Sequence, residues 1–268
     1  MKLIVRAADY AMTDSITDGC LKAIRDGILT DVGLMTNDVD HAARAVEEVK
    51  KYSHVSIGMD LNIVSGKPAS DPKDIPSLVD ENGILISSVY RKKNNLFDIP
   101  YSEIYFEMKN QVERFIQLVG KKPSYITGHS IATPDVLKAM DEIKKEYSVE
   151  GDCFSNEDLP TGQRWYFKNM AVDPNDRKPN YSLDAQASTN VTEHIVNGEC
   201  KFDFSKEYGL LATHCGYCDG ELLKMSTFSV IRGKELEALC SQEVKDWIKK
   251  NNIELINFDQ YLEKHLGD

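Results

Sequence analysis

The hydrophobic positions of this chain form short apolar runs that alternate with longer amphipathic stretches. The apolar runs predict strands at residues 3–9, 29–35, 55–61, 125–129, 210–214 and 253–258. The stretches with apolar residues at helical spacing predict helices at residues 14–27, 42–52, 103–120, 134–147 and 234–250, with a further helix starting at 260. The helix at 234–250 contains a break near Ser241. Such alternation is typical of βαβ units and therefore of a mostly parallel sheet.

Two stretches depart from this alternation. Residues 64–100 are rich in proline and glycine, and a long irregular segment of this kind is expected to be a lid, a substrate loop or an assembly element. Residues 153–204 give no clear pattern. The number of elements in 268 residues favours an α/β fold, a distorted or incomplete (β/α) barrel of the TIM type. We expect a single domain over residues 1–268, with an insertion at about 64–100.

Composition narrows the classes of function. The formal net charge is −11, and no basic cluster with interleaved aromatic residues is present, which argues against nucleic-acid binding. No apolar run approaches the ~18 residues that a membrane span needs. The chain begins with a strand-like run rather than a signal-peptide pattern, so we expect a cytoplasmic protein. Its six cysteines are then expected to be reduced thiols.

Four acidic or imidazole side chains fall at the ends of predicted strands: Asp9, Asp60, His129 and His214. Because the carboxyl ends of parallel strands meet on one face, these side chains are expected to lie together. Three oxygen or nitrogen ligands and one further histidine are what a metal-assisted hydrolase needs. Taken singly, each has an ordinary alternative, such as a turn cap or a hydrogen-bonded core histidine.

The segments around these residues resemble a known family, the YdjC-like carbohydrate deacetylases, which include chitooligosaccharide deacetylase. Residues 5–11 (Val-Arg-Ala-Ala-Asp-Tyr-Ala) resemble its Ala-Asp-Asp-(Phe/Tyr)-Gly signature. Residues 58–62, followed by Ser-Gly-Lys-Pro at 65–68, resemble its Gly-x-His segment. Gly128-His129 resembles the start of its histidine-rich motif, and His214-Cys-Gly-Tyr with Arg232 and Glu235 resembles its carboxyl-terminal motifs.

The resemblance implies hydrolysis of N-acetyl groups from small amino-sugar oligosaccharides or their phosphates. It places a divalent metal on Asp9, Asp60 and His129, with magnesium expected first and zinc, manganese or cobalt as alternatives. It makes His214 the candidate general acid, and Arg232 either a substrate contact or a structural partner of Glu235. A homodimer is a further expectation at the level of the family. The basic run 91–93 is expected to be solvated, although it could attract a phosphorylated sugar.

The sequence departs from the family pattern at two site positions. Ala8 stands where the signature has its first aspartate, the expected general base, and a methyl group cannot accept a proton. Since general-base catalysis is worth ~10²–10⁴-fold, activity is expected to be impaired. Asp60 stands where the family has a histidine, a milder change because carboxylates also bind metals. Two alternatives therefore stay open: an inactive relative that binds a sugar or sugar phosphate, and a hydrolase acting on another bond such as a phosphoester.

Overall fold

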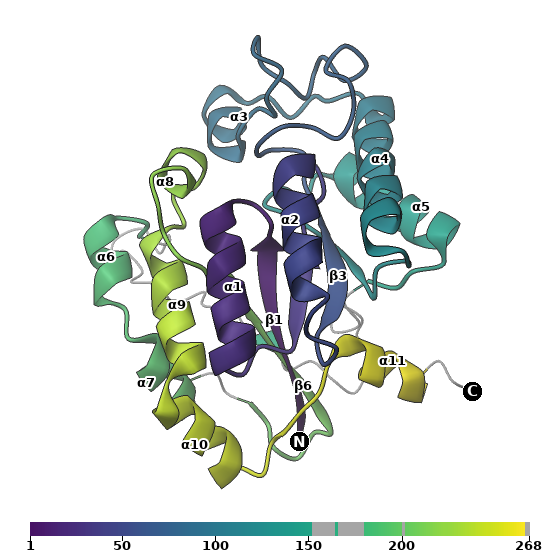
Figure 1. Cartoon of the computed structure of the whole chain (residues 1–268). Coiled ribbons are helices and arrows are strands. Elements are labelled where there is room, and N and C mark those ends of the chain that lie inside the picture. Colours follow the sequence, from purple (N-terminus) through teal and green to yellow (C-terminus); the bar gives the residue numbers. More distant parts are fainter. Residues whose placement is uncertain (152–163, 166–179, 200–201, 266–268) are drawn as a thin grey trace.

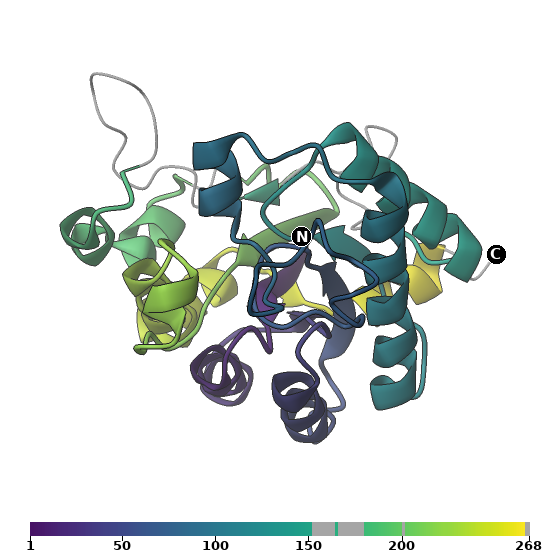
Figure 2. The same cartoon turned by 90° about the horizontal axis from the view of Figure 1, so that it is seen from above.

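The computed structural model describes residues 1–151, 164–165, 180–199 and 202–265. Within these residues, parallel strands form one sheet with the order β4-β3-β2-β1-β6-β5, and β7 pairs with the start of β1. The strands are β1 (Lys2–Tyr10), β2 (Asp31–Leu34), β3 (Ser56–Leu61), β4 (Ile126–Gly128), β5 (Arg164–Trp165), β6 (Tyr208–Thr213) and β7 (Glu254–Leu255). The sheet curls into a half-barrel with helices outside it (Figures 1 and 2), which confirms the predicted α/β, TIM-like fold.

The larger helices lie where the amphipathic stretches predict them. They are α1 (Asp14–Asp26), α2 (Val39–Val49), α4 (Tyr101–Val119), α5 (Pro134–Tyr147), α9 (Val230–Cys240), α10 (Gln242–Lys250) and α11 (Phe258–His265). Sequence patterns missed the short helices α3 (Ser88–Asn94), α6 (Leu183–Ser188), α7 (Val191–Val196) and α8 (Leu222–Met225). Helices of one or two turns contain too few residues to show a clear period.

Local side-chain contacts explain where the helices start. Thr13 accepts a hydrogen bond from the Ile16 amide at 3.2 Å and so caps α1. The predicted break near Ser241 is confirmed, since Ser241 is extended and its hydroxyl accepts the Val244 amide at 3.2 Å. It therefore ends α9 and caps α10, and the predicted helix is two helices.

The two faces of β1 point into different parts of the core. Leu3, Val5 and Ala7 belong to the large apolar cluster that includes residues of the outer helices. Ile4 belongs to a smaller cluster that contains Tyr125, Ile256 directly after β7, and residues of β6 and α11. Because side chains alternate along a strand, Ala8 shares the inner face with Ile4. Ala8 is therefore the inner-face residue nearest the carboxyl end of β1, and Asp9 comes directly after it.

Residues 64–100 cross the end of the half-barrel where the strands finish (Figure 1). This segment is anchored by Arg91 of α3, which is only 1% exposed, contrary to the prediction that the basic run is solvated. Its guanidinium donates to the carbonyls of Ile86, Leu96, Ser77 and Leu78 at 3.0–3.2 Å. Lys92 and Lys93 are exposed, as predicted.

Arg91→Met is expected to destabilise the fold by at least about 2 kcal/mol, because several carbonyls lose a charged donor in a buried setting. Methionine keeps an unbranched apolar stem and removes every donor. The free energy of unfolding from urea titration measures the change. Lys93→Met is the control, and an exposed site of this kind is expected to change stability by less than about 0.5 kcal/mol. Equal effects of the two substitutions would show that Arg91 does not anchor the segment.

No helix in the described part of the chain is long and apolar enough to cross a membrane. The described cysteines, Cys20, Cys215, Cys218 and Cys240, are free thiols, as expected. Cys153 and Cys200 lie outside the described residues.

Candidate active site

The strand ends bring the predicted side chains to one end of the half-barrel. Asp9 lies at the end of β1 with a positive φ of 63°, and Ala11 keeps a φ of 73° although it has a side chain where the family signature has glycine. His129 follows β4 directly, and its amide donates to Leu61 of β3 at 2.8 Å. His214 follows β6 directly. Parallel pairing therefore places these side chains as predicted.

The carboxylate of Asp9 lies at the centre of the site and is bound on both sides. Its Oδ1 accepts a hydrogen bond from His129 Nδ1 at 2.7 Å, and its Oδ2 accepts one from Arg232 Nη2 at 2.7 Å. Asp9 is only 2% exposed. Burial alone would raise its pKa, but the charges of His129 and Arg232 outweigh burial and hold the pKa well below its usual range. Asp9 is therefore ionised and charge-paired.

The two histidines have opposite pKa shifts. Burial would lower the pKa of His129, but the adjacent Asp9 carboxylate raises it above the ordinary value. Burial lowers the pKa of His214 to about 4. Near neutral pH, His214 is therefore neutral and able to accept a proton, while His129 is the histidine that holds a proton more readily. The general-acid role expected for His214 stays a prediction, and it would require His214 to gain a proton first.

Arg232 of α9 is fixed from several sides. Its Nε donates to the Phe228 carbonyl at 2.8 Å, and its Nη1 donates to the His214 carbonyl at 3.3 Å. The guanidinium carbon lies 5.3 Å from the centre of the Phe228 ring, a cation–π arrangement. Since Nη2 binds Asp9, the guanidinium joins the ends of β1 and β6 to α9. Its substrate contact stays a prediction.

Glu235 is a site residue whose role the sequence did not reveal. Its Oε2 accepts the His214 amide at 2.5 Å, and burial raises its pKa to about 8. Its position three residues after Arg232 suggested a local ion pair, but the structure pairs Arg232 with Asp9 instead. The sequence signal was the Arg-x-x-Glu spacing, which did not indicate that Glu235 would hold the backbone at His214.

Asp60 contacts backbone and hydroxyl groups and holds neighbouring strands together. Its Oδ2 accepts the Asp9 amide at 2.8 Å, and its Oδ1 is hydrogen-bonded to the Thr127 hydroxyl. Gly33 on β2 leaves room for this carboxylate, since a Cβ there would lie 2.5 Å from Oδ2. Asp60 thus fixes the backbone that presents Asp9, a role the sequence analysis did not assign to it.

This arrangement does not fit the predicted metal as it stands. Asp9 and His129 contact each other, as two ligands of one ion could, but both Asp9 oxygens and both Asp60 oxygens already have hydrogen-bond donors. Within residues 1–151, 164–165, 180–199 and 202–265, no group of three or more His, Cys, Asp or Glu side chains is placed to hold an ion.

A cavity of about 570 Å³ opens over these residues. Asp9, His129, His214 and Arg232 line one part of its wall. Its outer wall comes from the 64–100 segment, which contributes Lys92, and from the residues after β6. Pockets of ~300–1,000 Å³ are typical of small-ligand sites. The predicted lid or substrate loop therefore does border the candidate site.

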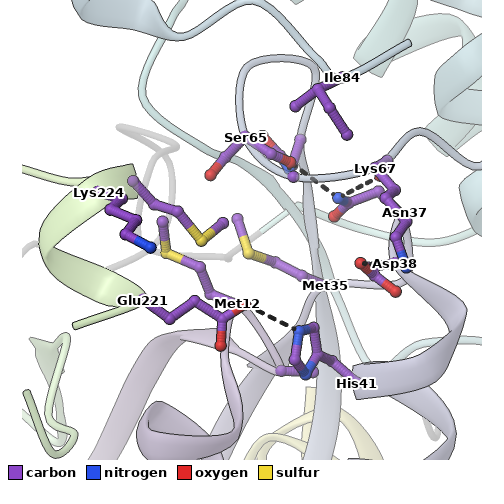
Figure 3. A pocket seen from close by; sticks show the side chains of 14 residues that line it. Met12, Met35, Asn37, Asp38, His41, Ser65, Lys67, Ile84, Glu221 and Lys224 are labelled. Atoms are coloured by element: carbon purple, nitrogen blue, oxygen red, sulfur yellow. Dashed lines mark hydrogen bonds and ion pairs between the residues drawn. The ribbon is translucent and has the colours of Figure 1, made fainter. Parts of the chain in front are cut away.

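A second cavity of about 270 Å³ adjoins the first and shares Met12, Ser65 and Met225 with it. Figure 3 shows Met12 and Met35 pointing into this space, with His41 and Glu221 below them. His41 Nδ1 lies 3.3 Å from Asp14, and its Nε2 lies 3.4 Å from Glu221, so it connects α2 to the segment preceding α8. The two cavities are therefore neighbours that share part of their lining.

An α/β half-barrel with acid and imidazole side chains at its strand ends belongs to the class of folds that carry their active sites there. The family model described as YdjC-like protein matches residues 2–250, and the chain belongs to this family. Carbohydrate deacetylase 2 of Listeria innocua is 30% identical over 265 residues, covering 96% of this chain and 98% of that protein. A carbohydrate deacetylase of Clostridium beijerinckii is 29% identical, with coverages of 96% and 99%.

A solved structure supports the fold independently. A protein from Enterococcus faecalis, proposed to cleave cellobiose phosphate, superposes with a TM-score of 0.72. It is 22% identical, and the match covers 97% of this chain and 98% of that chain. At this identity the likeness concerns the fold alone.

Proposed function

We propose that this chain is a carbohydrate deacetylase that acts on N-acetyl groups of small amino-sugar oligosaccharides, with activity limited by Ala8. The observation that carries the proposal is the meeting of Asp9, His129, His214 and Arg232 in the wall of one cavity at the strand ends. Full-length relatives named carbohydrate deacetylase support the same reaction class.

Hydrolysis of an amide requires that water lose a proton and that the departing amine gain one. Neutral His214 can take a proton, and His129, polarised by Asp9, can give one. Asp9 binds Nδ1 of His129, so Nε2 is the nitrogen left for substrate or water. Ala8 offers no carboxylate at the position where the family has its expected base, so we propose that turnover is slow.

The shape and charge of the cavity support an oligosaccharide, including a phosphorylated one. The adjoining cavity gives room for a second sugar ring beside the reacting one. Lys92 lines the larger cavity, and in the described part of the chain it has no acidic partner. The carboxylate in the wall of this cavity, that of Asp9, is already paired with His129 and Arg232. We therefore propose that Lys92 is available to bind a phosphate group on the sugar.

Lys92→Ala is expected to weaken binding of phosphorylated N,N′-diacetylchitobiose by at least about tenfold, because a charge-assisted contact is worth ~1.5–3 kcal/mol. Binding of the unphosphorylated sugar should change little. Lys93→Ala is the matched control, since Lys93 is exposed and does not line this cavity. Titration calorimetry measures both affinities. Equal losses for the two sugars would contradict phosphate recognition by Lys92.

A second candidate function is sugar binding without turnover, which Ala8 and the Asp9–Arg232 ion pair favour. Hydrolysis of a phosphoester is the third candidate function of this site. Acetate release from N,N′-diacetylchitobiose and its phosphate separates the three. Acetate supports the proposed deacetylase, binding without product supports the second function, and released phosphate supports the third. A cytoplasmic location and a homodimer stay predictions.

A further inference from the structure

The ion pair between Arg232 and Asp9 raises the question of what balances the charge of the site. Both side chains are 2% exposed, and the guanidinium is held by three separate contacts besides Asp9: two carbonyls and the Phe228 ring. A buried carboxylate needs a fixed positive partner, which a metal ion supplies in a metalloenzyme. Here a side chain of the chain itself stands in that position.

We infer that Arg232 takes the place of a divalent ion at Asp9, so that this site keeps its charge balance and its geometry without a metal. A divalent ion on Asp9 would have to compete with a guanidinium 2.7 Å from the same carboxylate and would be repelled by it. The inference concerns the chain's affinity for metals and does not depend on which sugar or bond the site acts on.

The two unusual residues of the site agree with this inference. Ala8 removes a carboxylate from the inner face beside Asp9, and in the described residues Asp9 is then the only acidic group paired with Arg232. Asp60 uses both of its oxygens to hold the Asp9 amide and the Thr127 hydroxyl. With alanine at position 8, Arg232 is free to bind Asp9. With its oxygens engaged in this way, Asp60 is withdrawn as a third ligand of a metal ion.

The experiment is a titration of the purified full chain with Mn²⁺, following free Mn²⁺ by electron paramagnetic resonance. Manganese prefers oxygen ligands to thiols, so the free cysteines of the described residues should compete little for it. The wild-type protein is expected to bind no Mn²⁺ saturably. Arg232→Gln is expected to gain a site at least about tenfold tighter than any in the wild type, because the competing charge is gone.

Lys234→Gln is the matched control, since it removes the same charge from a half-buried position on α9 where the lysine pairs with Glu237, and it should gain no site. Adding Asp9→Asn to Arg232→Gln should abolish the gained site. If Arg232→Gln does not fold, Ala8→Asp gives a second test, because its carboxylate offers Arg232 another partner and releases Asp9. One Mn²⁺ per wild-type chain that Asp9→Asn removes would overturn the inference. So would failure of both Arg232→Gln and Ala8→Asp, each folded, to gain a site.

Discussion

Ala8→Asp is expected to raise the rate of acetate release from N,N′-diacetylchitobiose by about 10²–10⁴-fold, the usual contribution of a positioned general base. Position 8 lies on the inner face of β1, directly before Asp9, where a carboxylate would join the site. Ala8 is 8% exposed and belongs to neither apolar cluster, so the added carboxylate need not displace core side chains.

The control for this prediction is Ala8→Asn, which has nearly the same shape but cannot serve as a base. Both variants are assayed beside the wild type, with a chelator and with added divalent ions. If Ala8→Asp is no faster than Ala8→Asn under either condition, then the missing carboxylate is not what limits this chain, and binding without turnover becomes the better account.

Asp9→Asn is expected to lower the free energy of unfolding by about 3–5 kcal/mol, since it leaves the buried guanidinium of Arg232 without a counter-charge. Asparagine is nearly isosteric and tolerates the positive φ of 63° at this position, so the backbone need not change. The loss therefore reports the charge pair rather than a cavity or a strained turn.

Urea unfolding followed by circular dichroism measures this loss. Asp18→Asn is the matched control, because the ion pair of Asp18 with Arg44 is exposed, and the substitution should cost less than about 1 kcal/mol. The double variant Asp9→Asn with Arg232→Gln should recover part of the stability, because no unpaired charge then stays buried. A single-variant loss no greater than that of Asp18→Asn would contradict the role given to the ion pair.

The sequence predicted the parts of the site that follow from strand periodicity. Asp9, His129 and His214 lie where they were expected because Asp9 is the penultimate residue of β1, and His129 and His214 directly follow β4 and β6. The sequence analysis could not show what each side chain contacts. Arg232 lies 223 residues after Asp9, and only the folding of α9 against β1 and β6 brings the two together.

Two other residues show the same limit on reading function from sequence. Arg91 lies in a run of basic residues that the sequence analysis predicted to be solvated. Its guanidinium is instead buried and bound to carbonyls of its own segment, up to 14 residues away in sequence. Asp60 ends a strand and could be either a ligand or a hydrogen-bond acceptor. The choice depends on the Asp9 amide and on Thr127 of β4, whose positions follow from strand register rather than from local pattern.

The measurement that tests the account most directly is calorimetric titration of the wild-type chain with N,N′-diacetylchitobiose, beside cellobiose, which has hydroxyl groups where the first sugar has acetamido groups. It needs no turnover, so it does not depend on Ala8. The account predicts saturable binding of the acetylated sugar, much weaker binding of cellobiose, and loss of the preference in His129→Ala. Equal affinity for both sugars, or no binding of either, would contradict the claim that this cavity recognises acetylated carbohydrates.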